Sequence, residues 1–275
     1  MRVSAIHTYP IKGCRRIDHD TAVVEPWGIE HDRRWLVTDP DGVAITQREV
    51  ASLGQLRAVP GQDGISLSFS GQTLWVPIEA NPIAKGDVFG AVVAATPAGP
   101  VADAWLSAAL GADARLVWLD DPGRRRIDPQ LGEPESATVS FADEAPLLLA
   151  TTASLARLND WIAEGEQRDE GPLPMERFRP NVVVDGSAPF EEDAWVGGVI
   201  RIGELEFRVL QACGRCVVTT TDQATGVRGK EPLRTLGRHR NVNQKLLFGV
   251  HLSPVTAGRI SVGDEVTVPS GALVD

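Results

Sequence analysis

The residues with the clearest capacity for chemistry are Cys213 and Cys216, which stand three positions apart with Arg215 between them. A thiolate is a good ligand for a soft or high-valent metal centre, and a guanidinium group binds phosphate well. The presence of both groups within four residues predicts a site for an anionic cofactor that is bound through sulfur.

The same spacing allows other interpretations. A redox pair of the thioredoxin type should open a helix, but residues 217–221 are β-branched and predict a strand. A zinc site needs further ligands, and neither Cys14 nor His239 and His251 has the required spacing. A single metal thiolate needs no further protein ligand if the cofactor brings its own sulfurs. Two buried cysteines that pack as small hydrophobic residues are an equal alternative.

A basic loop near the N-terminus contains Lys12 and Gly13. Gly13 lets the backbone approach a ligand closely, and Lys12 would then contact a phosphate as a point charge. The alternative is an exposed basic loop, which is the commoner case for such a run.

Two arginines precede Trp35 in a segment that predicts a strand. Because side chains alternate along a strand, either Arg33 or Arg34 must point inward. A half-buried arginine needs an anion or a carboxylate partner. Either a bound anion fills this role, or Asp32 or Glu30 does.

Further candidates lie at two other strand entries. The proline after Arg179 favours extended backbone, which would place Arg179 and Asn181 on one side as a fork of donors. A solvated strand entry is the alternative. Asp143 and Glu144 precede a buried apolar run and could hold a base-like ligand edge or orient an arginine. We favour the structural interpretation for Glu144.

Composition limits the class of function. The chain has 275 residues and a net charge of −10, which should repel nucleic acid and anionic membranes. Three cysteines without an even pairing favour a reducing compartment. No signal peptide and no apolar run long enough to span a membrane are visible. We therefore expect a cytoplasmic protein that binds neither nucleic acid nor membrane.

Short strands with tight turns dominate the pattern and predict a barrel or sandwich. Residues 65–69 and 73–77 alternate as a hairpin, and residues 88–93 suggest another strand. Helices are expected at residues 101–110 and 154–164. A polar, proline-containing stretch near residue 120 predicts a boundary between domains at 1–120 and 135–270.

Taken in order along the chain, these motifs resemble those of a known family. Tyr9-Pro10-Ile11-Lys12, Asp32-Arg33-Arg34-Trp35, Phe178-Arg179-Pro180-Asn181 and Cys213-Gly214-Arg215-Cys216 carry the resemblance. The chain is similar to MOSC-domain proteins with the associated N-terminal β-barrel domain, such as the mitochondrial amidoxime-reducing component and its bacterial homologues. The resemblance implies a mixed α/β, mainly β fold, with a MOSC-type β-barrel, an N-terminal barrel-like domain and a few short helices.

The resemblance also implies a cofactor and its contacts. The family binds the molybdenum cofactor, a pyranopterin phosphate (molybdopterin) whose dithiolene holds molybdenum, and the site would lie between the two domains. The family's metal ligand falls on Cys216. Its phosphate and pterin contacts fall on Lys12, Gly13, Arg33, Asp143, Glu144, Arg179, Asn181, Gly214 and Arg215. Gly13 and Gly214 stand where serine is common and can offer backbone N–H groups, whereas Glu144 replaces a common threonine and adds negative charge.

The activity implied by the resemblance is the two-electron reduction of N-hydroxylated compounds, such as amidoximes, hydroxylamines and N-hydroxylated bases. The chain lacks the four cysteines of a plant-type ferredoxin domain. We therefore expect electrons from a separate iron–sulfur or flavin protein. The alternative is a non-catalytic carrier of the molybdenum cofactor or of persulfide sulfur on Cys216.

Overall fold

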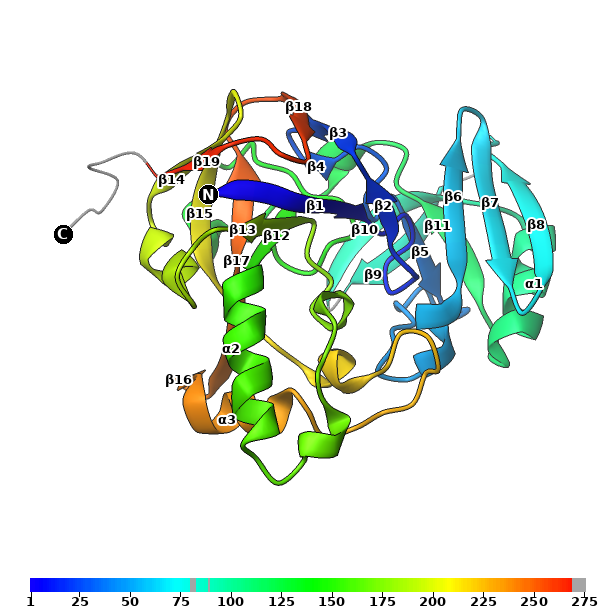
Figure 1. Cartoon of the computed structure of the whole chain (residues 1–275). Helices are drawn as coiled ribbons and strands as arrows, with labels where there is room; N and C mark the ends of the chain where they lie inside the picture. Colours follow the sequence, from blue (N-terminus) through cyan, green and yellow to red (C-terminus); the bar gives the residue numbers. More distant parts are fainter. Residues whose placement is uncertain (80–82, 89, 269–275) are drawn as a thin grey trace.

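The fold is mainly β, as the sequence predicted. The computed structural model describes residues 1–79, 83–88 and 90–268 (Figure 1). Phe89 of the expected strand at residues 88–93, and the last two residues of the predicted second domain, lie outside these ranges.

The elements are as follows. The strands are β1 (Arg2–Thr8), β2 (Ile17–His19), β3 (Thr21–Glu25), β4 (Gly28–Ile29), β5 (Trp35–Thr38), β6 (Arg57–Gly61), β7 (Gly64–Phe69), β8 (Gln72–Pro77), β9 (Ala84–Val88), β10 (Ala91–Pro97), β11 (Arg115–Trp118), β12 (Leu147–Thr151), β13 (Val182–Asp185), β14 (Val199–Ile202), β15 (Leu205–Gly214), β16 (Asn241–Val242), β17 (Lys245–Pro254), β18 (Gly258–Ser261) and β19 (Val266–Thr267). The α-helices are α1 (Pro100–Leu110), α2 (Thr152–Ala163) and α3 (Leu233–His239), and the 3-10 helix η7 (Val217–Thr220) adjoins Cys216.

The largest sheet combines strands from both ends of the chain. Its order is β19-β14-β15-β17-β12-β13-β1-β2, with β16 paired to β17. Strand β1 pairs antiparallel with β13, and β3 pairs with β18, so the beginning of the chain adds to the sheets of its second half. The proposed division at residues 1–120 and 135–270 stays a prediction, and these pairings tie the two parts together.

The remaining strands form smaller sheets on the other side of the molecule (Figure 1). One has the order β5-β11-β10-β9, and another is the meander β6-β7-β8. The predicted hairpin at residues 65–77 is confirmed as β7 and β8. Among the described residues, the pairing gives four sheets, and this agrees with the predicted mainly β class.

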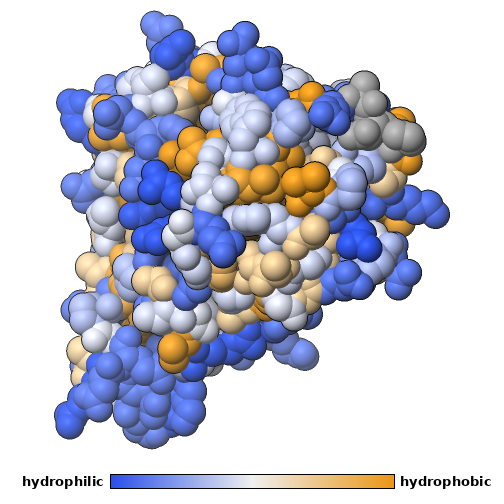
Figure 2. All heavy atoms as spheres, turned by 90° about the vertical axis from the view of Figure 1, so that its right-hand side faces the viewer, coloured by the Kyte–Doolittle hydropathy of each residue, from blue (hydrophilic) through white to orange (hydrophobic). Residues whose placement is uncertain are grey.

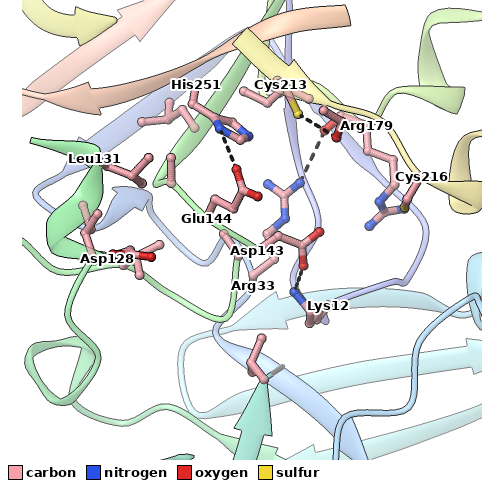
Figure 3. Close-up of a pocket in the computed structure, with 18 of the residues that line it drawn as sticks. Lys12, Arg33, Asp128, Leu131, Asp143, Glu144, Arg179, Cys213, Cys216 and His251 are labelled. Atoms are coloured by element: carbon pink, nitrogen blue, oxygen red, sulfur yellow. Dashed lines mark hydrogen bonds and ion pairs between the residues drawn. The ribbon is translucent and has the colours of Figure 1, made fainter. Parts of the chain in front are cut away.

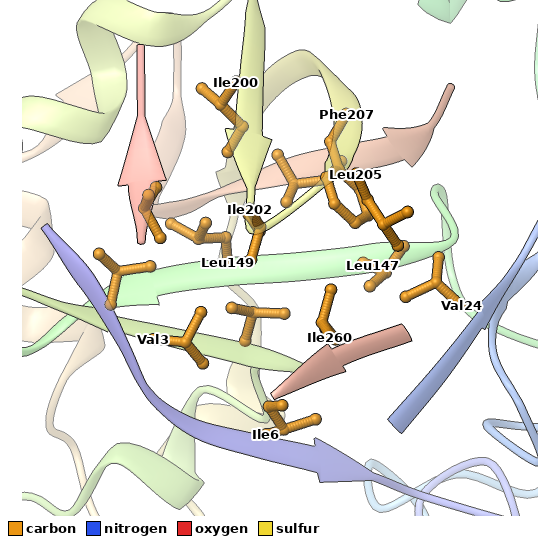
Figure 4. Close-up of a cluster of buried hydrophobic side chains, with 14 of the residues drawn as sticks. Val3, Ile6, Val24, Leu147, Leu149, Ile200, Ile202, Leu205, Phe207 and Ile260 are labelled. Carbon is orange, nitrogen blue, oxygen red and sulfur yellow. The ribbon is translucent and has the colours of Figure 1, made fainter. Parts of the chain in front are cut away.

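The main core lies on the large sheet. Buried side chains from β1, β12, β14, β15 and β18 meet there, including Ile6, Leu149, Ile202, Phe207 and Ile260 (Figure 4). Full burial of each such side chain stabilises the fold by about 1.5–3 kcal/mol. Because strands far apart in sequence share this core, it holds the loops at their ends in fixed relative positions.

Both predicted helices are present. Helix α1 has a proline in its first turn, and Gly111 closes it in the left-handed conformation with φ of 68°. Helix α2 begins after Thr151, whose side chain accepts a hydrogen bond from the Ser154 backbone N–H. Both helices end close to the predicted positions.

One face of the molecule shows mainly hydrophilic residues. On the face formed by the right-hand side of Figure 1, blue hydrophilic residues surround a smaller group of hydrophobic ones (Figure 2). Within the described ranges, no helix is both long and apolar enough to cross a membrane.

Candidate functional site

A cavity of about 820 Å³ brings the predicted residues together. All ten of them line it: Lys12, Gly13, Arg33, Asp143, Glu144, Arg179, Asn181, Gly214, Arg215 and Cys216. They come from loops after β1, before β5, before β12 and before β13, and from the end of β15 and the loop after it, which the sheets bring side by side (Figure 3). The volume is in the range of pockets that bind drug-sized ligands and cofactors.

The loop after β1 brings Lys12 and Gly13 to the cavity. The Lys12 backbone N–H donates to the Trp35 carbonyl, and its ammonium donates to the Phe141 carbonyl and to the Asp143 carboxylate. Gly13 has φ of +83°, and a Cβ there would lie 2.7 Å from Leu53 Cδ2. The positive φ favours glycine at this position, and a larger residue would also require the Leu53 side chain to shift.

Arg33 is positioned by a turn and not by a strand. It has φ of 47°, and β5 begins only at Trp35, so the predicted alternation of strand faces is wrong here. The guanidinium donates to Asp32 and to Asn181 Oδ1 at 2.9 Å. The carboxylate partner considered as an alternative is thus present, and the buried arginine has its countercharge within the chain.

Arg179 also differs from its predicted conformation. It is left-handed, with φ of 56°, although the following proline favours extended backbone. Its guanidinium donates to the Cys14 carbonyl at 2.7 Å and lies 4.1 Å from the centre of the Tyr9 ring. The carbonyl of Arg179 accepts from Arg33, so the turn is held in place by the neighbouring arginine.

Asn181 is fully buried and its side chain is engaged within the protein. Its Oδ1 accepts from Arg33 and from the Leu148 backbone N–H, and its Nδ2 donates to the His7 carbonyl. These bonds tie the cavity wall to β1 and β12. The predicted fork of donors from Arg179 and Asn181 is therefore not formed.

Cys216 immediately precedes the 3-10 helix η7, where the sequence predicted a strand. That prediction is wrong because the threonine hydroxyls satisfy local carbonyls: Thr219 Oγ1 donates to the Cys216 carbonyl and Thr220 Oγ1 to the Val217 carbonyl, each at 2.8 Å. The tight turn leaves Cys216 half-buried on the cavity wall, whereas the other two cysteines are buried.

Cys213 has an unusual environment at the end of β15. Burial works to raise the pKa of its thiol, but the charges of Arg215 and His251 and their hydrogen bonds lower the pKa to about 7. Arg215 Nη1 donates to Cys213 Sγ at 2.8 Å, and Arg215 Nη2 donates to the Phe178 carbonyl at 2.6 Å. Cys213 is thus a thiolate candidate beside Cys216.

The two carboxylates before β12 have different partners. Asp143 pairs with Lys12, and despite partial desolvation this ammonium holds the pKa of the carboxyl well below its usual range. Glu144 accepts from Gln211 Nε2 at 2.7 Å, and its Oε2 lies 3.4 Å from His251 Nδ1 (Figure 3). The partners of Glu144 are thus a glutamine and a histidine, and not the arginine that the structural interpretation expected.

Several lining residues were missed by the sequence reasoning: Arg48, Arg125, Gln211, Lys245 and His251. Arg125 lies in the charged stretch that we interpreted as a surface loop, yet it is buried and donates to the Ala142 carbonyl at 2.6 Å. His251 lies within β17, a strand that the pattern did not predict. Only the pairing of β17 with β15, which a linear pattern does not show, places this histidine at the cavity.

The cavity is cationic although the protein is acidic. Among its described lining residues, eight are lysine or arginine and three are aspartate or glutamate, against a net charge of −10 for the chain. Such a concentration of positive charge favours an anionic ligand.

Unpaired polar atoms show that these residues fit a phosphorylated group. Arg125 Nε, Arg179 Nη2 and Arg215 Nε are buried without a hydrogen-bond partner. Buried donors of this kind are costly unless a ligand or water binds them. In the described ranges, no cluster of three or more His, Cys, Asp and Glu side chains could hold a metal ion.

Comparison with known proteins defines the class. The MOSC domain family matches residues 136–267 and the MOSC N-terminal beta barrel domain family matches residues 1–113. The chain belongs to the MOSC-domain proteins that carry this N-terminal domain, which confirms the resemblance seen in the motifs.

Similar curated proteins include two kinds. Mitochondrial amidoxime reducing component 2 of Bos taurus is 33% identical, over 96% of this chain and 82% of that protein. The human mitochondrial amidoxime-reducing component 1 is 30% identical over the same shares. The molybdenum cofactor sulfurase of Danio rerio is 31% identical over 94% of this chain, which spans only 33% of that protein.

Solved structures are more distant. The YUAD protein from Bacillus subtilis is 10% identical and covers 96% of this chain and 93% of its own, with a TM-score of 0.40. A match at this level supports no argument about function.

Proposed function

We propose that this chain binds the molybdenum cofactor in the cationic cavity and reduces small N-hydroxylated compounds, with electrons from a separate iron–sulfur or flavin protein. Cys216 would be the protein ligand to the metal. The observation that carries the proposal is the convergence of a half-buried thiol and eight basic side chains, drawn from both parts of the chain, on one cavity.

The unpaired arginine nitrogens indicate which residues would bind the phosphate of the cofactor. Arg179 and Arg215 have buried nitrogen atoms available for a phosphate, and charge-assisted bonds to phosphate are among the strong hydrogen bonds. Lys12 and Arg33 already contact carboxylates, so they would add positive charge and fix the shape of the wall. When bound, the cofactor supplies the two-electron chemistry, and the protein holds and orients it.

Similarity to molybdenum cofactor sulfurases supports a second candidate of a different class. In that case the chain would carry the cofactor, or persulfide sulfur on Cys216, without turnover. Stoichiometric molybdenum together with dye-driven reduction of hydroxylamine supports the enzyme. Persulfide on Cys216 in a protein that lacks metal supports the carrier.

The decisive variant is Cys216→Ala. We expect it to fold normally, because the side chain is half-buried and no hydrogen bond of the thiol fixes η7. We expect turnover to fall by about a hundredfold or more, because loss of a residue that only supports a metal ligand already costs about 10- to 100-fold. Elemental analysis, circular dichroism and the rate of hydroxylamine reduction measure the three properties.

Cys213→Ala is the matched control for metal content, because it removes a thiol three positions away in the same cavity. It should retain molybdenum. If Cys216→Ala reduces hydroxylamine at the parental rate, the assignment of Cys216 as the metal ligand is wrong.

A further inference from the structure

Three side chains from different elements form a continuous series between solvent and the cavity. Glu144 precedes β12 and its side chain is 54% exposed, whereas the His251 side chain on β17 is only 9% exposed. Their closest atoms, Glu144 Oε2 and His251 Nδ1, are 3.4 Å apart. On the inner side, His251 interacts with the buried thiol of Cys213 on β15.

The sheet register fixes this arrangement. His251 pairs with Leu148 on β12 and with Gln211 on β15, and Gln211 in turn donates to Glu144 at 2.7 Å. Glu144, Gln211 and His251 carry groups that accept or donate hydrogen bonds. These three residues and Leu148 line the cavity. The exposed carboxylate is thus held beside the buried imidazole by a strand neighbour of that imidazole.

The charges around His251 suit a group that gains and loses a proton. Burial works to lower the pKa of His251, but the Cys213 thiolate and Glu144 together raise it, against the opposing effect of Arg215. No carboxylate or base faces His251 from β12, where its partner is Leu148. His251 Nδ1 is buried and makes no hydrogen bond, and it faces Glu144 Oε2 at 3.4 Å, so its proton would be exchanged with that carboxylate.

We propose that Glu144, His251 and Cys213 form a proton-transfer path from bulk water to the thiolate end of the cavity. This inference rests on the proposed reductase function and deepens it.

The reaction shows why such a path is needed. Reduction of a hydroxylamine, R–NHOH, to the amine R–NH₂ breaks the N–O bond and releases one water. It consumes two electrons, which the iron–sulfur or flavin partner supplies, and two protons. A general acid with a pKa near neutrality is the most effective donor at neutral pH. Each proton would enter at Glu144, pass through His251 and leave from the Cys213 thiol, which is then reprotonated from His251. One proton goes to the departing oxygen and completes the water, and the other goes to the nitrogen and completes the amine.

The first test uses thiol reactivity and does not depend on turnover. In a Cys216→Ser background, the alkylation rate of Cys213 by iodoacetamide is measured against pH. The additional change His251→Asn should lower the rate at pH 7 by about fivefold to tenfold, because the thiolate loses a stabilising cation. His239→Asn is the matched control, since His239 is exposed and lies outside the cavity lining. An unchanged pH dependence in His251→Asn overturns the coupling of the two groups.

The second test uses the metal-loaded protein and hydroxylamine. At pH 7.5, Glu144→Gln and His251→Asn should each lower turnover by about tenfold at unchanged molybdenum content, and the deficit should shrink toward acidic pH. Added imidazole or formate should restore Glu144→Gln, because the carboxylate that it replaces is reached from solvent. Glu204→Gln, at an exposed position, is the control for loss of a surface charge.

The outcomes separate the two proposals. Suppose that the wild-type protein holds molybdenum and turns over, and that both variants keep its rate and pH profile. This result overturns the proton-transfer path and leaves the proposed function intact. Failure of small acids to rescue Glu144→Gln also overturns it. A wild-type protein without metal or turnover overturns the proposed function.

Discussion

Cys14 and Cys213 are both buried, but they lie in contrasting surroundings. Burial raises the pKa of the Cys14 thiol to about 11, and the nearby charge of Arg179 only partly opposes this. Cys213 experiences the same effect of burial, yet Arg215 and His251 bring its pKa to about 7. Direct contact with a guanidinium, at 2.8 Å, distinguishes Cys213. The comparison teaches that contacting charges, more than depth, decide which thiol is reactive.

The largest effect predicted by this comparison is in thiol reactivity. At pH 7 about half of Cys213 is ionised, against about one part in ten thousand of Cys14, although a thiolate of lower pKa is the weaker nucleophile. We expect Cys213 to react with iodoacetamide at least about a hundredfold faster. Peptide mass spectrometry of the Cys216→Ser protein measures both rates, and equal rates would contradict the contrast.

The stability of the protein should depend on pH in opposite directions through the two thiols. The pKa of the Cys14 thiol rises from 9.0 in the unfolded chain to about 11 in the folded protein. Its contribution to the free energy of unfolding is therefore complete below pH 9 and is lost as the pH rises to 11. The pKa of the Cys213 thiol falls from 9.0 in the unfolded chain to about 7 in the folded protein. Its contribution to the free energy of unfolding is therefore complete above pH 9 and is lost as the pH falls through 7.

Cys14→Ala isolates the first of these effects. Because a shift of two pKa units corresponds to about 2.7 kcal/mol, the parent should lose about that much more unfolding free energy than the variant between pH 8 and pH 11.5. Urea titrations at both pH values measure this difference. Parallel losses in the two proteins would show that Cys14 does not titrate as its burial requires.

The smallest predicted effect concerns Arg215. Arg215→Met keeps much of the apolar stem but removes the charge and the hydrogen bond to Cys213. We expect alkylation of Cys213 at pH 7 to slow by about tenfold, while that of Cys14 is unchanged. Arg201→Met, at an exposed position on β14, provides the control. An equal loss in both variants would indicate a general effect of charge and not the contact.

The sequence allowed the cavity residues to be predicted because they lie in short motifs with characteristic neighbours. The conformations of these residues could not be predicted equally well. Arg33 and Arg179 are left-handed, and each is held by bonds to residues far away in the chain, such as Asn181 and Cys14. Local propensity contains no information about such partners.

Elements with strong local signals were easier to predict than the polar parts of the site. Hairpin β7–β8 and helix α1 carry their signals locally, in alternation and in the closing glycine. His251 becomes significant only when β17 pairs with β15, and η7 forms because threonine hydroxyls bond to carbonyls three residues earlier. Pairing and side-chain competition of this kind are tertiary and conformational effects that a linear pattern does not reveal.

The position of β1 in the large sheet has a consequence for biosynthesis. This strand cannot find its partner β13 until the ribosome has made most of the chain, and the backbone N–H of Val3 bonds to the carbonyl of Asp264 still later. Contacts between such distant segments slow folding. Since Lys12 and Gly13 follow β1 directly and His251 lies on β17, the wall of the cavity is complete only after both strands have been made, and we expect a cofactor to enter after that point.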